Sequence, residues 1–139
     1  MVLVAITLTT VWRNLGFTFI IYLGGLSSIP TEVLEAAEVD GAAGLQKLWK
    51  ITLPLLSPTI LFAVVTDAIR MLQFFDEPFI MTRGGPGDAS RTVVMMMYEN
   101  AFGNLNFGYG SAIALSLFLV IMGVTALQFY LSRRWVFYK

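Results

Sequence analysis

The sequence contains no cysteine and no histidine. Their absence excludes thiol nucleophiles, histidine-based catalytic triads, disulfide frameworks and zinc sites built on either residue. Charge is also scarce: charged residues make up 13% of the chain, against about 25% in an average soluble domain. Basic and acidic residues balance at 9 each, so no positive excess favours nucleic acid. We expect no nucleic-acid partner and no metal or other cofactor held by this chain.

Apolar residues, in contrast, are abundant. They make up 57% of the 139 residues, and the mean hydropathy is +0.74. Crossing a bilayer takes about 20 consecutive apolar residues, and three stretches are long enough, about 1–26, 58–81 and 109–131. We therefore predict an all-α, polytopic membrane protein with three transmembrane helices, solvated by a lipid bilayer.

The basic residues between these spans are distributed unevenly. Only Arg83 and Arg91 lie in the 82–108 loop, whereas five lie in the 27–57 loop or after the third span: Lys47, Lys50, Arg133, Arg134 and Lys139. Because cytoplasmic loops carry an excess of lysine and arginine, the 27–57 loop and the C-terminus are predicted to be cytoplasmic and the 82–108 loop external. The external N-terminus then begins directly inside a span, and we expect further helices upstream.

The predicted cytoplasmic loop contains residues that typically begin and end helices, at positions that predict a helical hairpin. Pro30 can begin a short helix, and Gly41 can end it in a left-handed conformation. A second helix, about 45–51, is predicted to end at Pro54, and Pro58 is predicted to begin the second span. On the external side, turn-forming residues come first and a short helix over 90–102 is expected to lie at the outer face.

This hairpin carries the most specific motif of the chain, which follows the pattern E-A-A-x(3)-G-x(9)-I-x-L-P. The residues that match it, together with the aspartate before the glycine, are Glu35, Ala36, Ala37, Asp40, Gly41, Ile51, Leu53 and Pro54. The pattern resembles the EAA loop of the membrane subunits of ABC importers. Other stretches, including 12–17, 26–30, 82–87 and 98–102, resemble permeases of the maltose and glycerol-phosphate type. The resemblance covers nearly the whole chain, but only the last three of the family's six or so core spans.

The resemblance implies a role in ATP-driven import of a sugar or polyol-type solute through the plasma (inner) membrane. It implies as partners a pair of ATP-binding cassette subunits, a second permease subunit and an external solute-binding protein. The chain itself is expected not to be an enzyme, since it has no G-x-x-x-x-G-K-[ST] stretch. ATP would be bound and hydrolysed by the partner.

The residue types in the motif suit a close contact with an ATP-binding subunit. Alanines and a glycine leave little side-chain bulk, so a partner's groove can approach closely, and Glu35 can fix the register. The alternatives are a membrane scaffold or channel component without ATP coupling, in which the hairpin is merely interfacial, and a truncated remnant that does not transport.

Four polar residues in the predicted second span are candidates for the translocation pathway: Asp67, Arg70, Gln73 and Asp76. Charges near the bilayer midplane are costly and usually face a bundle interior or a water-filled cavity. Asp67 and Arg70 could instead pair with each other on one helix face, since they are three residues apart. Arg13, in the first span, could likewise line the pathway or pair with an acid on a helix outside this chain.

Overall fold

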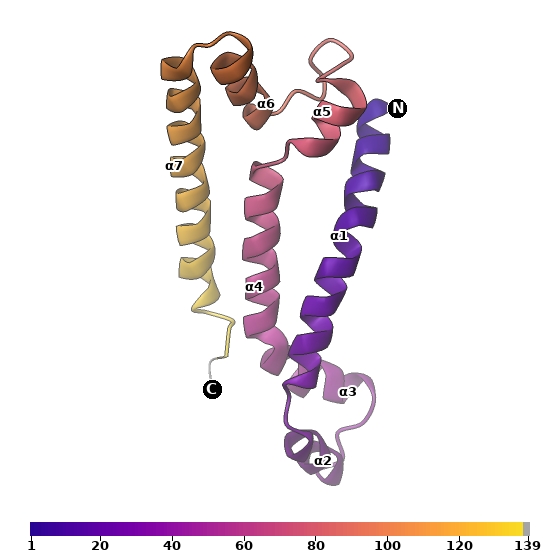
Figure 1. Cartoon of the computed structure of the whole chain (residues 1–139). Coiled ribbons are helices and arrows are strands. Elements are labelled where there is room, and N and C mark those ends of the chain that lie inside the picture. Colours follow the sequence, from indigo (N-terminus) through magenta and orange to yellow (C-terminus); the bar gives the residue numbers. More distant parts are fainter. Residues whose placement is uncertain (138–139) are drawn as a thin grey trace.

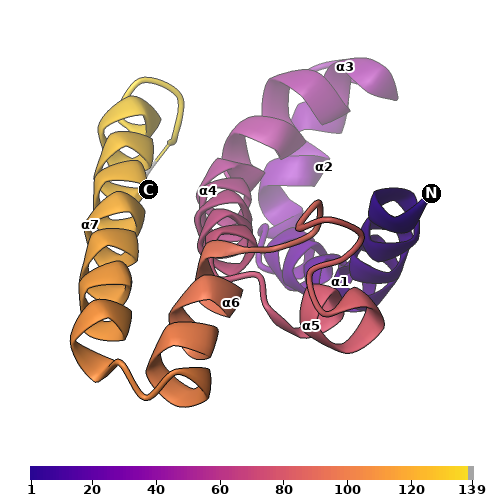
Figure 2. The ribbon, with the colours of Figure 1, turned by 90° about the horizontal axis from the view of Figure 1, so that it is seen from above.

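The computed structural model describes residues 1–137, and all of its elements are helical. Three long helices, α1 (Val2–Ser27), α4 (Leu53–Leu72) and α7 (Phe107–Ser132), lie side by side with α4 in the middle (Figure 1, Figure 2). A helix of 26 residues, such as α1 or α7, is about 39 Å long, enough for a hydrocarbon core of about 30 Å. All three long helical segments are apolar enough to cross a membrane, which confirms the predicted fold class.

At one end of the long helices, the chain forms the expected hairpin. Its first arm is α2 (Thr31–Val39), and its second arm is α3 (Leu45–Lys47), which continues through the π-helical segment η1 (Leu48–Thr52) into α4 (Figure 1). The structure differs here from the sequence prediction, because neither Pro54 nor Pro58 interrupts the helix.

The helix continues through both prolines, although neither has an N–H donor, because the local hydrogen bonding adjusts. Ahead of Pro54, the chain switches to π-type bonds, and the Leu53 amide donates to the Leu48 carbonyl. Pro58 leaves the Pro54 carbonyl without its usual helical donor. The Ser57 hydroxyl donates to that carbonyl instead, at 2.6 Å. The hairpin and the span therefore form one continuous helix.

At the opposite end, the second span stops earlier than expected. α4 ends at Leu72, and a separate short helix, α5 (Asp76–Thr82), follows after a non-helical joint. The external helix predicted over 90–102 is divided into α6 (Val93–Tyr98) and the π-helical segment η2 (Glu99–Gly103). The aromatic rings of Phe75 and Phe79 stack on each other, and Tyr98 meets the first ring at a tilt and the second edge-on. These contacts join α5 to α6.

Two glycines lie where neighbouring helical segments approach closely. A Cβ on Gly25 of α1 would lie 2.6 Å from the Thr59 side chain of α4, and one on Gly110 of α7 would lie 2.8 Å from the Ala101 Cβ of η2. The segment after α7 returns towards α4, where the Phe137 amide donates to the Ser57 hydroxyl at 3.0 Å. Lys139, which contributed to the predicted orientation, lies outside the described residues.

Candidate functional site

The first arm of the hairpin presents a small-residue surface to its surroundings. Glu35 and Ala36 are exposed, whereas Ala37 is buried. Two larger apolar residues near the tip of the hairpin are also uncovered, Val39 at 88% and Leu45 at 73% exposure. Such exposure of apolar side chains beside charged ones is typical of a contact surface.

The turn after α2 is a Schellman motif centred on Gly41. The Gly41 amide donates to the Glu38 carbonyl at 3.0 Å, and the Ala42 amide donates to the Ala37 carbonyl at 2.9 Å. These two bonds require a left-handed residue at the turn, and Gly41 has φ = +80°. The predicted end of the helix at Gly41 is therefore confirmed. The position favours glycine because a Cβ is disfavoured at such a φ.

The two arms of the hairpin are tied together by an ion pair that the motif does not include. Nζ of Lys47 lies 2.6 Å from Oε1 of Glu38. Beyond it, the remaining motif residues Ile51, Leu53 and Pro54 are half-buried and lie in the continuous helix that becomes α4. One continuous helix thus begins at the hairpin and runs as the middle helix of the bundle to Leu72 at the opposite end.

A second candidate site lies between α1 and α4. Two adjoining hollows, of about 390 and 420 Å³, share Asn14, Arg70 and Met71 in their walls. Both Gln73 and Asp76 line the first hollow, and Asp67 lines the second. The structure therefore brings all four candidate pathway residues to one side of the α1–α4 pair.

Asp67 and Arg70 do not form the ion pair that their spacing allows. The guanidinium of Arg70 lies over the ring of Phe17 on α1, 3.7 Å from its centroid. Such cation–π contacts are favourable when the cation sits over the ring face. Within residues 1–137, Asp67 makes no ion pair, and it lines the second hollow without pairing to Arg70.

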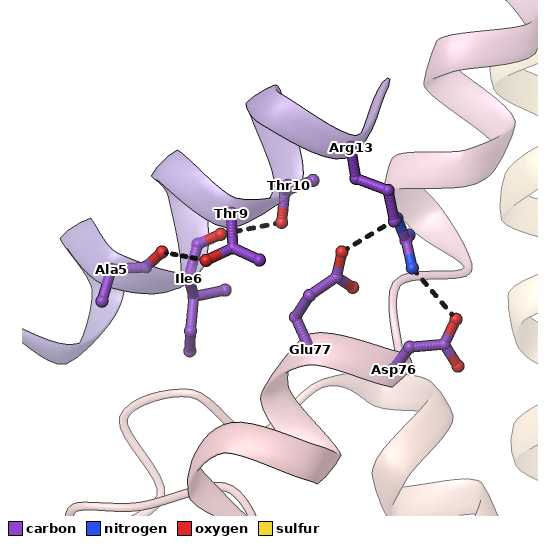
Figure 3. Close-up of polar contacts among 7 residues, drawn as sticks. All are labelled: Ala5, Ile6, Thr9, Thr10, Arg13, Asp76 and Glu77. Carbon is purple, nitrogen blue, oxygen red and sulfur yellow. Dashed lines mark hydrogen bonds and ion pairs between the residues drawn. The ribbon is translucent and has the colours of Figure 1, made fainter. Parts of the chain in front are cut away.

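Arg13 connects α1 to α5. Its Nε lies 3.1 Å from Oε1 of Glu77, and its Nη1 lies 3.3 Å from Oδ2 of Asp76 (Figure 3). Of the two interpretations of Arg13, as a residue of the pathway or as the partner of an acid on a helix outside this chain, the second was wrong, because both acids belong to the chain itself. It failed because residues 76–77 were assigned to the interior of a span, whereas they begin a separate helix that turns back to α1.

Glu77 is the site residue that sequence reasoning missed. Its side chain is 7% exposed, and its Oε2 has no hydrogen-bond partner in the described part of the chain. The signal was present, since two adjacent acids in an apolar stretch are unusual. Among residues 1–137, no cluster of three or more acidic side chains could hold a metal ion.

The chain is similar in sequence to known membrane transport proteins. Residues 1–137 match the family model described as "binding-protein-dependent transport system inner membrane component". The sulfoquinovosyl glycerol transport system permease protein of Agrobacterium fabrum is 43% identical over 129 residues, covering 93% of this chain. The multiple sugar-binding transport system permease protein of Streptococcus mutans is 38% identical over 123 residues, covering 88%. The sn-glycerol-3-phosphate transport system permease protein of Rhizobium meliloti is 35% identical over 139 residues, covering 98%.

The matches cover only part of these three relatives. The chain spans 42% of the length of the first, 42% of the second and 47% of the third. Residues 1–137 of this chain, which match the family model, contain the three long helices, the hairpin and the α1–α4 hollows.

Proposed function

Because this chain belongs to the family of inner membrane components of binding-protein-dependent transport systems, we propose that it helps to translocate a sugar or polyol-type solute and receives force from a separate ATPase through its hairpin. The family consists of ABC permease subunits, which are non-catalytic transport components of the inner membrane. The family membership is shown by the sequence match, whereas the identity of the solute, the coupling contact and the partners are proposed.

The observation that carries the coupling role is the hairpin. Its α2 arm exposes Glu35 and Ala36 at the far end of the bundle, and its other arm runs into α4 without a break. A displacement of α2 is transmitted to the other arm through the Glu38–Lys47 ion pair and the turn at Gly41. A rigid helix then carries it to the wall of the α1–α4 hollows.

The hollows support the pathway role. Asn14, Arg70 and Gln73 supply hydrogen-bond donors, Asp67 and Asp76 supply acceptors, and Phe74 and Phe75 supply apolar faces. A polyhydroxylated solute needs donors, acceptors and a flat apolar face in one place. The relatives are named for sugars, sulfoquinovosyl glycerol and glycerol phosphate, and all of these carry hydroxyl groups.

The partners follow from the same proposal. ATP-binding cassette subunits would contact the hairpin, a second permease subunit would complete the pathway, and an external solute-binding protein would deliver the solute to the opposite end. The basic residues Lys50, Arg133 and Arg134 lie at the hairpin end of the bundle. This supports a cytoplasmic hairpin and C-terminus.

The coupling role is tested by Glu35→Lys and Gly41→Asp in the complete transporter. Glu35→Lys reverses a charge on the exposed arm, and Gly41→Asp places a Cβ at φ = +80°, which costs about 1–2 kcal/mol. We expect normal insertion, with ATPase released from membranes or left idle and solute uptake lost. The measurement is ATPase retention on membranes alongside uptake.

Glu32→Lys is the matched control, because it makes the same charge change at an exposed position earlier in α2. It should leave most ATPase on the membrane. Wild-type retention and uptake in both Glu35→Lys and Gly41→Asp would instead favour a scaffold or channel component without ATP coupling.

A further inference from the structure

The short helix α5 lies between two non-helical joints. Before it, Gln73 to Phe75 are non-helical, and after it Arg83 adopts a left-handed conformation with φ = +49°. Between these two joints, α5 is only 7 residues long. It lies across the ends of α1 and α4 on the side of the bundle opposite the hairpin (Figure 1).

Side-chain contacts hold α5 on two sides. On one side, the rings of Phe75 and Phe79 pack on Tyr98 of α6. On the other side, Arg13 of α1 binds both acids at the start of α5, and the guanidinium lies between the two carboxylates (Figure 3). Within residues 1–137, these two salt bridges of Arg13 are the only ones that join α5 to another helix.

This ion pair stands at the edge of the polar hollow. Arg13 and Asp76 both line it, together with the joint residues Gln73, Phe74 and Phe75. Movement of α5 away from α1 would therefore open the hollow at this end. The movement would also separate the buried Glu77 carboxylate from its cation, and burying an unpaired charge is costly. The closed arrangement and the ion pair thus stabilise each other.

We propose that α5 is a lid over the outer end of the α1–α4 hollow, and that the ion pair of Arg13 with Glu77 is its latch. Asp76 gives the same guanidinium a second, more exposed contact. The inference rests on the proposed function only in placing the hollow on the solute pathway. It is independent of the ATPase contact, which lies at the other end of the bundle.

The test measures access to the hollow. Asn14→Cys introduces the only cysteine of the chain into the shared wall of the two hollows. In the assembled transporter in membranes, an impermeant maleimide added on the α5 side reports how often the lid is open. We expect Glu77→Gln or Arg13→Gln to raise the modification rate roughly tenfold, as expected when a charge-assisted contact made only in the closed state is lost.

Two further variants make the result decisive. Exchange of the charges, Arg13→Glu with Glu77→Arg, should return the rate towards that of the unaltered latch, which a merely misfolded protein would not do. Glu99→Gln is the matched control, since it removes an ion pair with Arg91 in the same external region without touching the latch. Unchanged rates in both single variants, failure of the exchange to restore the rate, or an equal rise in the control would each overturn the latch.

Solute uptake, measured in parallel, separates this inference from the proposed function. If the modification rates follow the latch while uptake of every tested sugar and polyol is absent in the unaltered transporter, the lid stands and the solute assignment fails. If uptake is normal and the rates ignore the latch, the lid fails and the proposed function stands.

Discussion

Three acidic residues near the α1–α4 hollows have different surroundings. Glu77 is buried against Arg13, and Asp76 is exposed beside the same guanidinium. Asp67 forms an ion pair with neither Arg13 nor Arg70. An acid paired with a cation contributes to packing, whereas an acid that faces a hollow alone is available to a solute. Of the three, Asp67 is the residue for which we propose a contact with the solute.

This difference gives a prediction for Asp67→Asn in a complete transporter. The substitution keeps the shape of the side chain but weakens its ability to accept hydrogen bonds from a solute hydroxyl. Hydrogen bonds to charged groups contribute about 1.5–3 kcal/mol, so uptake should fall about 10- to 100-fold with unchanged protein in the membrane. The measurement is initial uptake rate against the amount of inserted protein.

The outcome also distinguishes the two interpretations of the Asp67 and Arg70 spacing. A structural pair would make Asp67→Asn destabilising and would let Arg70→Gln compensate. Because Arg70 packs on Phe17 instead, we expect no compensation in the double variant. Normal uptake by Asp67→Asn alone would remove Asp67 from the pathway.

For single residues, the sequence predicted which ones belong to a motif better than it predicted which side chains contact each other. The spacing of Glu35, Ala36, Ala37 and Gly41 identified the hairpin, because such a motif depends only on local order along the chain. The partners of Arg13 and Arg70 could not be found in that way. Each depends on how two helices separated in sequence are placed side by side.

At the scale of elements, helix continuity decides what the hairpin can transmit. Two prolines within a few residues usually end a helix, and the sequence prediction followed that rule. Here the helix reaches Pro54 through a π-type turn, in which the Leu53 amide donates to the Leu48 carbonyl. The Ser57 hydroxyl supplies the donor that Pro58 lacks. Such local repairs depend on backbone geometry that residue type alone does not specify, and π-type turns are frequent at functional sites.

The contact between α1 and α4 provides a prediction about element packing. Gly25→Leu would drive a side chain into Thr59 and Leu56, whose atoms lie 2.6 and 2.8 Å from where a Cβ would be. Overpacking of this kind typically costs about 1–3 kcal/mol. Thermal unfolding of the purified chain in detergent should show the loss as a lower midpoint.

The neighbouring glycine supplies the control for this measurement. A Cβ on Gly24 would have no atom within 4 Å, so Gly24→Leu should leave the unfolding midpoint unchanged or slightly higher. Equal effects at the two positions would mean that α1 and α4 do not pack through Gly25.

At the scale of the whole molecule, the three spans bury little of their surface against one another. The most apolar window of α7 contains no buried residue, and that of α1 is 11% buried. In water such helices would associate, so their apolar surfaces require a bilayer or further apolar helices. The composition predicted a membrane protein, because the chain has more apolar residues than a core of this size can contain.

The whole molecule also separates its polar parts into two ends, which leads to a prediction of topology. Gln46 lies in the hairpin and Asp88 in the loop after α5, at opposite ends of the long helices (Figure 1). Both residues are exposed. In whole cells, a cysteine introduced by Asp88→Cys should react with an impermeant thiol reagent, whereas one introduced by Gln46→Cys should react only after permeabilisation.

The physical reason is the charge of the two ends. Lys50, Arg133 and Arg134 lie at the hairpin end, and the positive-inside preference keeps such residues in the cytoplasm. Since the parent chain has no cysteine, the unsubstituted protein is the background control, and permeabilised cells show that both positions can react. Labelling of Gln46→Cys but not of Asp88→Cys in intact cells would invert the orientation. The hairpin would then face away from any cytoplasmic ATPase, and the lid at α5 would face the cytoplasm, so both proposals depend on this result.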